Sequence, residues 1–339
     1  MRIAIDIREA VAPDRAGKGI YNLETTRRLI ENKDIEWVLF SNRETDEFDD
    51  VRVIKKKGFS WHWAVRKALI ANPVDHYFAP TSYLTPLLLK DTPFSIVVHD
   101  LIAFIYPQGH SFKAKFIETF SLPKIIDKAK HIFAVSEHTK GDLLRMFPHI
   151  GSSKISVTGC GIDLERYSKG DGPDTDDPYI LTLATIIPRK NYLNLIKAFE
   201  LIADEIPHRL VIGGGDGMGA EQVHKYAEKS KYRERIDFLG YVDNSLLPKL
   251  YQGASAFVFP SIYEGFGIPP LEAYACGCPV TCSKASSLPE VMGEKAKYFD
   301  PFDVQDISES IIRLLENPQH TERGQLPTWD SVTSKIQLK

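Results

Sequence analysis

The stretch from Ala256 to Pro279 constrains the fold more than any other part of this sequence. It begins with the short apolar run Ala-Phe-Val-Phe, which predicts a buried strand. Gly265 and Gly267 follow, and glycine lets backbone N–H groups approach a ligand closely. Pro269 and the proline after it stand where a helix would begin, since proline suits the first helical turn. A strand that enters a helix through a glycine-rich turn is typical of doubly wound α/β folds.

Two carboxylates flank this turn. Glu264 lies on the glycine-rich loop, and we expect Glu272 in the first helical turn. A helix N-terminus offers unpaired N–H groups and partial positive charge, which suit a phosphate. Carboxylates accept hydrogen bonds from hydroxyls. The pattern therefore favours recognition of a phosphate and a polyol together, as a nucleotide-sugar requires. The alternative is an ordinary strand-to-helix turn whose acids complement the helix dipole.

Composition narrows the function classes. The length of 339 residues indicates about two domains, and 43% hydrophobic with 26% charged residues is ordinary for a globular protein. A formal net charge of −3 gives no support to a nucleic-acid role. No apolar run approaches the roughly 18 residues of a membrane span. The segment 1–7 is too short for a signal peptide and reads as a first strand, so we expect a cytoplasmic protein.

The four cysteines raise the question of a metal site. Cys276, Cys278 and Cys282 cluster, whereas Cys160 lies apart. The cluster lacks the paired Cys-x2-Cys spacing of zinc sites, so small buried residues are the preferred interpretation. We expect no metal site, no required cofactor and, in a reducing compartment, no disulfide.

A family resemblance enters at the two carboxylates. Glu264, seven intervening residues and Glu272, within Glu-Gly-Phe-Gly-Ile-Pro-Pro-Leu-Glu-Ala, resemble the Glu-x7-Glu signature of retaining GT-B glycosyltransferases. The chain is similar to glycosyltransferase family four, also described as the group 1 glycosyl transferases, over most of its length. The resemblance implies two Rossmann-like doubly wound domains facing a central cleft.

The resemblance also implies roles around this motif. Glu264 would hold sugar hydroxyls, and Glu272 would hold the ribose of the donor. The backbone N–H groups that would face the donor are those of Gly265, Phe266, Gly267 and Ile268.

In the N-terminal half, polar groups follow two predicted strands. The strand 1–7 leads into a loop with Gly17 and Gly19, before a helix predicted over 21–32. The strand 94–98 ends at His99, and ligands bind beyond such strand ends. In the resembling family the glycine loop faces the donor phosphates and the acceptor, and the histidine contacts the donor sugar. A flexible surface loop and a structural histidine are the plain alternatives.

In the C-terminal half, two cations follow the strand 179–184. Arg189 and Lys190 lie at a strand-to-helix junction, where they could converge on a pyrophosphate. Surface charge at a helix start is the alternative, although cations there oppose the helix dipole. The segment resembles the family's diphosphate clamp. Its Pro-Arg-Lys-Asn form is similar to that of bacterial mannosyltransferases.

A dinucleotide site is the rival interpretation of a second glycine turn. The pattern Gly-x-Gly-x-x-Ala begins at Gly215, but its ribose-binding acid should lie near the end of the next strand. Asp237 falls inside that strand, so the match is weak. In the resembling family this turn lies beside the donor, which adds Gly214 to the donor-binding set. The family's nucleotide base lies beside the backbone that corresponds to Gly240, Tyr241 and Val242.

The segment 111–130 predicts a helix with one basic side. Its lysines are Lys113, Lys115, Lys124, Lys128 and Lys130, beside an apolar face of phenylalanines. Such a surface could rest on anionic lipid, which would place the protein at the inner membrane face. A solvated helix packed on its sheet is the blander alternative.

These patterns predict four segments: an acceptor-binding domain (1–168), a linker (169–178), a nucleotide-sugar-binding domain (179–320) and a tail (321–339) that returns to the first domain in many family members. The predicted activity is retaining, metal-independent transfer of a hexose from a nucleotide-diphospho-sugar to a saccharide or lipid-linked saccharide hydroxyl. Mannose from GDP-mannose is the preferred donor. The expected catalytic groups are His99, Arg189, Lys190 and Glu264.

Three alternatives to a transferase stay open. They are a GT-B-fold nucleotide-sugar epimerase, an NAD-binding oxidoreductase that uses the Gly215 turn, and a non-catalytic sugar-nucleotide-binding protein. Product analysis separates the transferase from the epimerase.

Overall fold

The chain forms two compact units, each built on one parallel sheet. The computed structural model describes residues 1–13, 15, 17–107, 112–170, 172, 177–318 and 325–338, with 112–114 as backbone only. Among these, the first unit comprises the residues within Met1–Ile105, Ser111–Gly161 and Pro327–Lys339. The second comprises those within Tyr106–His110 and Ile162–Leu326.

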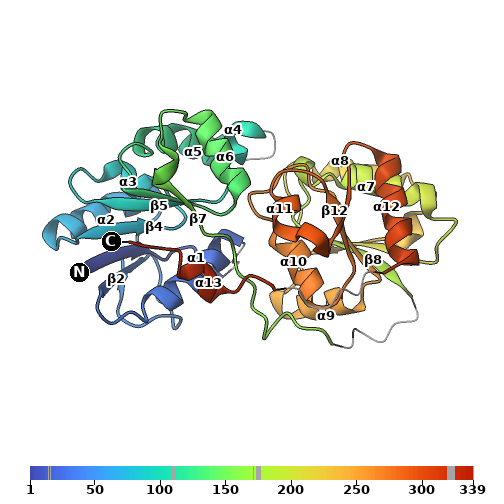
Figure 1. The fold of residues 1–339 in the computed structure, drawn as a ribbon, viewed down its shortest axis with the longest axis horizontal. Helices are drawn as coiled ribbons and strands as arrows, with labels where there is room; N and C mark the ends of the chain where they lie inside the picture. The colour runs from blue at the N-terminus through green and yellow to red at the C-terminus, as the bar shows by residue number, and fades with distance from the viewer. Residues whose placement is uncertain are drawn as a thin grey trace. The chain divides into compact units, whose positions relative to one another are not determined.

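The first unit has a seven-stranded sheet with helices on both faces (Figure 1). The order is β3-β2-β1-β4-β5-β6-β7, and all neighbouring pairs are parallel. Its strands are β1 (Arg2–Asp6), β2 (Glu36–Ser41), β3 (Val51–Val53), β4 (His76–Ala79), β5 (Phe94–Val98), β6 (His131–Ala134) and β7 (Ile155–Val157). Its helices are α1 (Gly17–Leu29), α2 (Phe59–Ala71), α3 (Leu84–Leu88), α4 (Ile102–Ile105), α5 (Phe112–Ile125), α6 (Glu137–Met146) and α13 (Trp329–Thr333), with a 3₁₀ turn, η1 (Ser152–Lys154).

The second unit repeats this plan with six strands. Its order is β10-β9-β8-β11-β12-β13, again parallel throughout. Its strands are β8 (Tyr179–Leu183), β9 (Arg209–Gly213), β10 (Ile236–Gly240), β11 (Ala256–Phe259), β12 (Val280–Ser283) and β13 (Lys297–Phe299). Its helices are α7 (Tyr192–Ile202), α8 (Ala220–Glu228), α9 (Leu247–Gly253), α10 (Ile268–Ala275), α11 (Leu288–Met292) and α12 (Val304–Glu316), with 3₁₀ turns η2 (Pro188–Lys190), η3 (Arg233–Arg235), η4 (Asn244–Leu246) and η5 (Gly293–Lys295).

Both sheets reverse their strand order at one point. The reversal lies between β1 and β4 in the first unit, and between β8 and β11 in the second. In doubly wound folds, ligands bind beyond the carboxyl ends of the strands at this switch point. The prediction of two Rossmann-like doubly wound domains is confirmed, because both sheets are parallel and carry this order.

Two helices begin earlier than the sequence predicted. Helix α1 starts at Gly17 rather than near residue 21, so Gly17 and Gly19 lie in its first turn and not in a loop. A Cβ at Gly19 would come 2.7 Å from the carbonyl oxygen of Glu9, so only glycine lets the helix pack this closely. Helix α10 starts at Ile268, which moves Glu272 from the first turn into the second.

The boundary between the units also differs from the predicted one. The first unit ends at Gly161 rather than at residue 168. Ile162 and Tyr167 are buried in the apolar core of the second unit, and the rings of Tyr167 and Tyr251 lie 6.2 Å apart. The predicted linker, 169–178, falls partly outside the described residues.

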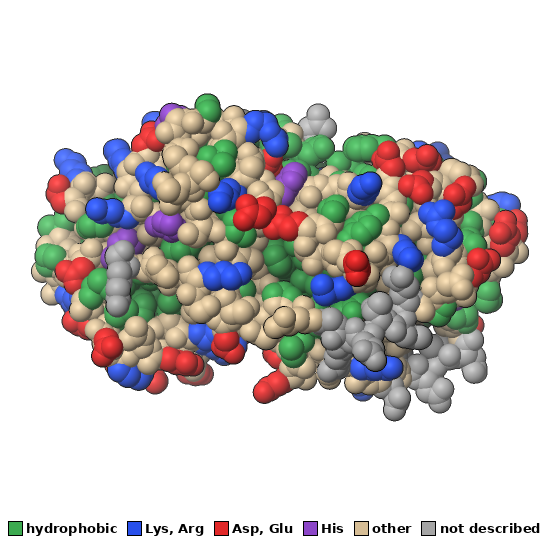
Figure 2. All heavy atoms as spheres, viewed as in Figure 1, with side chains coloured by type: hydrophobic (Ala, Val, Ile, Leu, Met, Phe, Trp, Pro, Cys, Tyr) green, Lys and Arg blue, Asp and Glu red, His purple; other side chains and the backbone are tan. Residues whose placement is uncertain are grey.

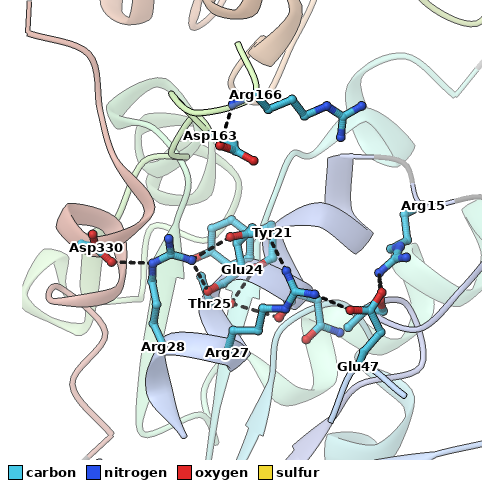
Figure 3. Close-up of polar contacts among 12 residues, drawn as sticks. Arg15, Tyr21, Glu24, Thr25, Arg27, Arg28, Glu47, Asp163, Arg166 and Asp330 are labelled. Atoms are coloured by element: carbon cyan, nitrogen blue, oxygen red, sulfur yellow. Dashed lines mark hydrogen bonds and ion pairs between the residues drawn. The ribbon is translucent and has the colours of Figure 1, made fainter. Parts of the chain in front are cut away.

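The C-terminal segment packs on the first unit. Thr328 caps α13, and Trp329 is 3% exposed with its ring 5.9 Å from that of Tyr21 in α1. Arg28 of α1 lies between Glu24 of its own helix and Asp330 of α13, at 2.7 and 2.5 Å (Figure 3). An apolar contact and an ion pair therefore join the two ends of this unit.

The surface mixes charges of both signs. On the face drawn in Figure 2, lysine and arginine side chains alternate with aspartate and glutamate over each unit. Among the described residues, no helix combines the length and apolarity needed to cross a membrane.

Candidate active site

Two loops meet at the switch point of the second unit. Turn η2, with Arg189 and Lys190, follows β8, and the loop that carries Glu264 follows the neighbouring strand β11. The two loops are joined by a backbone hydrogen bond from the Ile262 N–H to the Arg189 carbonyl oxygen, at 2.8 Å. Residues that lie 74 positions apart are thereby brought together at the carboxyl edge of the sheet.

Glu264 is the centre of this cluster. Its Oε1 accepts a hydrogen bond from Lys190 Nζ, lies 2.8 Å from Arg189 Nη1, and accepts one from Ser261 Oγ at 2.5 Å. The carboxylate and the lysine are buried, with Glu264 7% and Lys190 8% exposed. A buried charge is tolerated only when it is paired and hydrogen-bonded, and this one is both.

The electrostatic balance keeps Glu264 ionised. Burial alone would raise the pKa of this carboxyl, but the charges of Lys190 and then Arg189 outweigh it, with help from hydrogen bonds of Lys190 and Ser261. The pKa therefore lies below its ordinary value. At neutral pH the cluster holds two cations and one anion, so it retains one net positive charge.

Arg189 has bonding capacity that the described residues leave unused. Its Nη1 donates to the Tyr263 carbonyl oxygen at 2.7 Å. Its Nε is buried, and no described residue accepts its hydrogen bond. A buried donor without a partner costs about 1–3 kcal/mol, so the described residues leave this part of the cluster unsatisfied.

The turn with the two cations has a local cause. Asn191 follows it in the left-handed conformation, with φ 61°, which asparagine tolerates better than most residues. Asn191 Nδ2 donates to the Pro301 carbonyl oxygen at 2.6 Å and fixes the junction with α7. This explains the asparagine in the Pro-Arg-Lys-Asn segment.

The loop after β12 supports the glutamate, a role that the sequence did not reveal. The Glu264 N–H donates to Ser286 Oγ at 2.8 Å. Ser287 Oγ donates to the carbonyl oxygens of Glu264 and Phe266, at 3.0 and 2.9 Å. The available signal was position alone, because these serines follow the strand adjacent to β11.

Glycine is required where the loop enters α10. Gly267 has φ 92°, and a Cβ there would come 2.5 Å from Leu288 Cδ2. Gly265 and Phe266 lie on the loop before it, and Ile268 is the first helical residue. Proline has no N–H, so the two prolines after Ile268 leave the donors of this helix start to Ile268 and the loop.

Glu272 belongs to a different contact group from Glu264. Its Oε2 accepts a hydrogen bond from the Tyr251 hydroxyl at 2.9 Å, and Tyr167 adds a second. Burial raises the pKa of this carboxyl despite both bonds. The sequence identified the acid but not its two tyrosines, which come from α9 and from the segment after Ile162.

The second glycine turn lies at the carboxyl ends of β9 and β10. The Gly214 N–H donates to the Gly240 carbonyl oxygen at 2.7 Å. Gly214 has φ 134°, and a Cβ there would come 2.0 Å from the Ala184 carbonyl oxygen. Tyr241 is 64% exposed and Val242 is partly buried, so this edge offers backbone and ring surface.

Asp237 forms an ion pair with Arg209, away from the Gly215 turn. Both of its carboxylate oxygens accept hydrogen bonds from Arg209, each at 2.7 Å. Arg209 is the first residue of β9, so this pair lies away from the carboxyl end of the strands. Among the described residues, the acid that would bind ribose in a dinucleotide site is therefore absent from the position that the Gly215 turn requires.

In the first unit, His99 lies at the carboxyl ends of β4 and β5. Its Nε2 donates to the Pro80 carbonyl oxygen at 2.7 Å, and its ring meets the edge of Tyr21 at 5.0 Å. Burial and then the charge of Lys18 lower the pKa of His99 to about 4. The imidazole is therefore neutral at pH 7, with Nδ1 as its acceptor.

Lys18 is a neighbour that the sequence interpretation missed. It stands between Gly17 and Gly19, and its Nζ lies 3.6 Å from Asp100 Oδ2 and 3.5 Å from Glu118 Oε1. The position between two glycines already singled out was the available signal.

The structure thus brings Arg189, Lys190 and Glu264 into one contact cluster, with Gly265 to Ile268 on the adjoining loop. Glu272, Gly214, Gly240, Tyr241 and Val242 lie elsewhere in the second unit. His99, Gly17 and Gly19 belong to the first unit, where they surround Lys18.

Two protein-family models match the chain, roughly one for each sheet. The model "Glycosyltransferase Family 4" matches residues 17–166, and the model "Glycosyl transferases group 1" matches residues 163–325. Solved structures with similar folds include sucrose-phosphate synthase from Thermosynechococcus elongatus, with a TM-score of 0.76 and 18% identity over 99% of this chain and 94% of that one. HepE from Anabaena, solved with UDP and glucose, has a TM-score of 0.76 and 16% identity over 99% and 93%.

Relatives by sequence include O-antigen mannosyltransferases. The O-antigen chain mannosyltransferase B of Escherichia coli is 33% identical over 73% of this chain and 66% of its own length, just under two thirds. The serotype-specific mannosyltransferase WbdA of Escherichia coli is matched over only 31% of its length, at 32% identity. The mannosyltransferase RfbU of Salmonella typhimurium is 26% identical over 91% of this chain and 90% of its own. The chain therefore belongs to the group 1, family 4 glycosyltransferases and has their GT-B fold.

Proposed function

We propose that this protein is a retaining, metal-independent glycosyltransferase. In this proposal the second unit binds a nucleotide-diphospho-sugar, and the first binds the acceptor that supplies a hydroxyl. The observation that carries the proposal is the contact of Arg189 and Lys190 with one buried carboxylate at the β8/β11 switch point. Two fixed cations at that place suit the charge that grows on a leaving pyrophosphate.

Each member of the cluster has a separate task. Lys190 and Arg189 stabilise the leaving diphosphate, work that a divalent cation does in other transferases. Glu264 fixes both cations through Oε1. Its other oxygen, Oε2, remains to accept hydrogen bonds from sugar hydroxyls. Glu272 holds the ribose, Gly214 lies beside the donor, and Gly240, Tyr241 and Val242 border the base.

The first unit supplies a neutral donor-sugar contact. With its pKa lowered to about 4, His99 is uncharged at neutral pH and can accept a hydrogen bond at Nδ1. A neutral imidazole does not repel the positive character that develops on a reacting sugar. The acceptor hydroxyl then attacks on the face that the diphosphate leaves, and the departing phosphate takes its proton.

We propose a hexose as the transferred sugar, with mannose from GDP-mannose as the preferred donor. Two relatives that are 33% and 32% identical to this chain over their aligned parts are mannosyltransferases, which supports the choice of sugar. A growing polysaccharide or a lipid-linked saccharide is the proposed acceptor, since two of the relatives by sequence are O-antigen chain mannosyltransferases.

A peripheral contact with the inner membrane face fits a lipid-linked acceptor. Phe116 and Phe120 of α5 are stacked at 5.6 Å and are 57% and 43% exposed, and Lys124 Nζ lies 3.3 Å from the Phe120 ring centre. Exposed aromatic rings beside a lysine suit the interface of an anionic bilayer. Helix α5 ends at Ile125, so it is shorter than the helix predicted over 111–130. Ser111 and the side chain of Lys113 lie outside the described residues.

The first experiment is a thermal-shift panel in the presence of EDTA. GDP, UDP, ADP, TDP, NAD and their common sugar conjugates are each added at saturating concentration. A ligand at one hundred times its Kd stabilises by about 2.7 kcal/mol, a measurable rise in Tm. We expect stabilisation by one nucleoside diphosphate and its sugar conjugate, with GDP as the leading candidate. Stabilisation by NAD alone would contradict the proposal.

Activity then tests metal use and reaction type. With the donor identified, product analysis should show a new glycosidic linkage with the anomeric configuration of the donor sugar. Transfer should survive EDTA. An activity that EDTA abolishes and magnesium or manganese restores would refute metal independence, and an epimerised nucleotide-sugar as the product would refute transfer.

A further inference from the structure

The first unit contains a cavity at the edge of its sheet opposite to His99. Its volume is about 800 Å³. It lies at the amino ends of β4, β5, β6 and β7, whereas His99 follows the carboxyl end of β5. The proposed transfer reaction uses none of its lining residues. The polar side chains of the lining that matter here are His76, Ser95, His131, Ser156, Lys130, Lys140 and Lys335.

A row of polar side chains crosses four strands in this cavity. His76 of β4 is hydrogen-bonded through Nε2 to Ser95 Oγ of β5, at 3.0 Å. His131 of β6 pairs with Ser95 in register and is hydrogen-bonded through Nε2 to Ser156 Oγ of β7, at 2.8 Å. Interior strands of parallel sheets are ordinarily apolar, and burying polar groups costs free energy. The row is therefore unusual for β4, β5 and β6, which are interior strands.

Three lysines from three separate segments surround this row. Lys130 precedes β6, Lys140 belongs to α6, and Lys335 follows α13. Within the described parts of the chain, no carboxylate forms an ion pair with any of the three. Asp75, the only described acidic residue of the lining, accepts a hydrogen bond from the Arg2 N–H at 2.7 Å. The described side chains of the lining thus carry three positive charges against one negative charge.

Both histidines of the row are held in the neutral form. Burial and then the charge of Lys130 lower the pKa of His76 to about 4, and burial lowers the pKa of His131. Both imidazoles are therefore neutral at pH 7. They add hydrogen-bonding capacity to the cavity without adding charge, while the lysines provide the charge.

We propose that this cavity is a binding site for a small phosphate-bearing anion. Lysine ammonium groups are compact charges that bind phosphate oxygens, and serine hydroxyls and imidazole nitrogens supply directional bonds beside them. Lys335 lies in the C-terminal segment, and its Nζ already donates to the Thr158 carbonyl oxygen at 3.3 Å. A bound anion would therefore join that segment to α6 and to the amino edge of the sheet.

The test is calorimetric titration of the full chain with inorganic phosphate at low salt and pH 7.5. Because phosphate can also bind the Arg189 and Lys190 cluster, the series is run in an Arg189→Ala background. We expect saturable binding that Lys140→Ala and Lys335→Ala each weaken at least tenfold. Lys229→Ala, which removes an exposed lysine of the second unit, should leave the affinity unchanged. Absence of saturable binding, or an affinity unaffected by both cavity variants, would overturn the proposal.

Comparing the two cavity variants separates a loss of phosphate binding from a loss of structure. Lys335→Ala removes the bond to Thr158 and can loosen the C-terminal segment. Lys140→Ala removes a side chain with no ion pair to a described residue, so its effect reports on the cavity. A phosphate-dependent rise in Tm that Lys140→Ala abolishes would support the site by a second readout.

Vesicles distinguish a soluble phosphate from a lipid headgroup. Phosphatidylcholine vesicles with and without phosphatidic acid are sedimented with the wild type and with Lys140→Ala. Cosedimentation that needs both phosphatidic acid and Lys140 would assign the site to a phosphate headgroup. Phosphate binding without such cosedimentation would assign it to a soluble phosphate compound.

Discussion

The two switch points of this molecule share a topology and differ in chemistry. At β8/β11, two cations and a carboxylate are buried in direct contact, and the anion stays ionised. Near β1/β4, His99 is held neutral by burial, and Lys18 pairs with two carboxylates. The same sheet order therefore carries a contact cluster of two cations and one carboxylate in one unit, and a neutral histidine beside a lysine with two carboxylates in the other. Function is determined by the side chains placed on a fold rather than by the fold itself.

Replacing Glu264 should produce the largest effect. Glu264→Gln keeps the shape of the side chain but leaves Lys190 and Arg189 without their shared charge. We expect a loss of transfer of at least about a thousandfold. Because a buried pair is broken by removing one partner, unfolding free energy should also fall by about 3–5 kcal/mol. Transfer assays and urea titrations measure the two effects.

The matched control is Glu294→Gln, which removes an exposed carboxylate of the same unit. It should change neither quantity. Near wild-type turnover by the Glu264→Gln variant would show that this carboxylate does not act in the active site. The contrast drawn between the two switch points would then fail.

Replacing Arg189 or Lys190 should have the second-largest effect on transfer. We expect Arg189→Ala and Lys190→Ala each to lose about 2–4 kcal/mol of transition-state stabilisation, measured as kcat/KM. Both contact the same Oε1 atom, so the double variant should lose less than the sum of the single losses. An unchanged kcat/KM in both single variants would contradict the clamp, and strict additivity would contradict the shared contact.

Acid should separate the two units. In the first unit, the pKa values of His62, His76 and His99 are lowered to about 4. Below pH 6.5, the ordinary pKa of histidine, the unfolded chain therefore binds more protons than the folded chain. Their stabilising contribution is full above pH 6.5 and falls by about 1.4 kcal/mol per histidine per pH unit towards pH 4. In the second unit, Glu264 loses its contribution only below 4.5, the ordinary pKa of its carboxyl, and burial lowers the pKa of His208.

Hydrogen exchange read by mass spectrometry at pH 7, 5.5 and 4.5, corrected for the intrinsic rate, measures this difference. Peptides of the first unit should lose protection before those of the second. The opposite order would show that the neutral histidines do not govern acid stability. A variant with His62→Gln should shift the loss in the first unit to lower pH.

The smallest effect is expected at an exposed ion pair. Asp330 forms an ion pair with Arg28 (Figure 3), and its side chain is 81% exposed. The pairs of Glu264 are buried in contrast. Exposed pairs contribute about 0–1 kcal/mol. Asp330→Ala should therefore lower the unfolding free energy by less than about 1 kcal/mol. A double-mutant cycle with Arg28→Ala measures the coupling, and a coupling like that of a buried pair would overturn this ranking.

The sequence predicted the charged site better than its supports. Arg189, Lys190 and Glu264 were identifiable because each follows a strand in a short motif, and parallel strands end at one edge. Ser286 and Tyr251 were not, because their roles depend on which strands and helices become neighbours. The start of α1 was misplaced for a related reason, since Gly17 and Gly19 suit a loop locally, and only packing against Glu9 selects a helix.

The return of the C-terminal segment has a consequence for biosynthesis. Trp329 is buried against Tyr21, yet the ribosome adds these residues more than three hundred positions apart. The residues of the second unit within Ile162–Leu326 are added before this segment. The face of Tyr21 that Trp329 covers therefore stays uncovered until that part of the second unit has been synthesised. Truncation near residue 327 should leave this face exposed and yield a chain that needs chaperones.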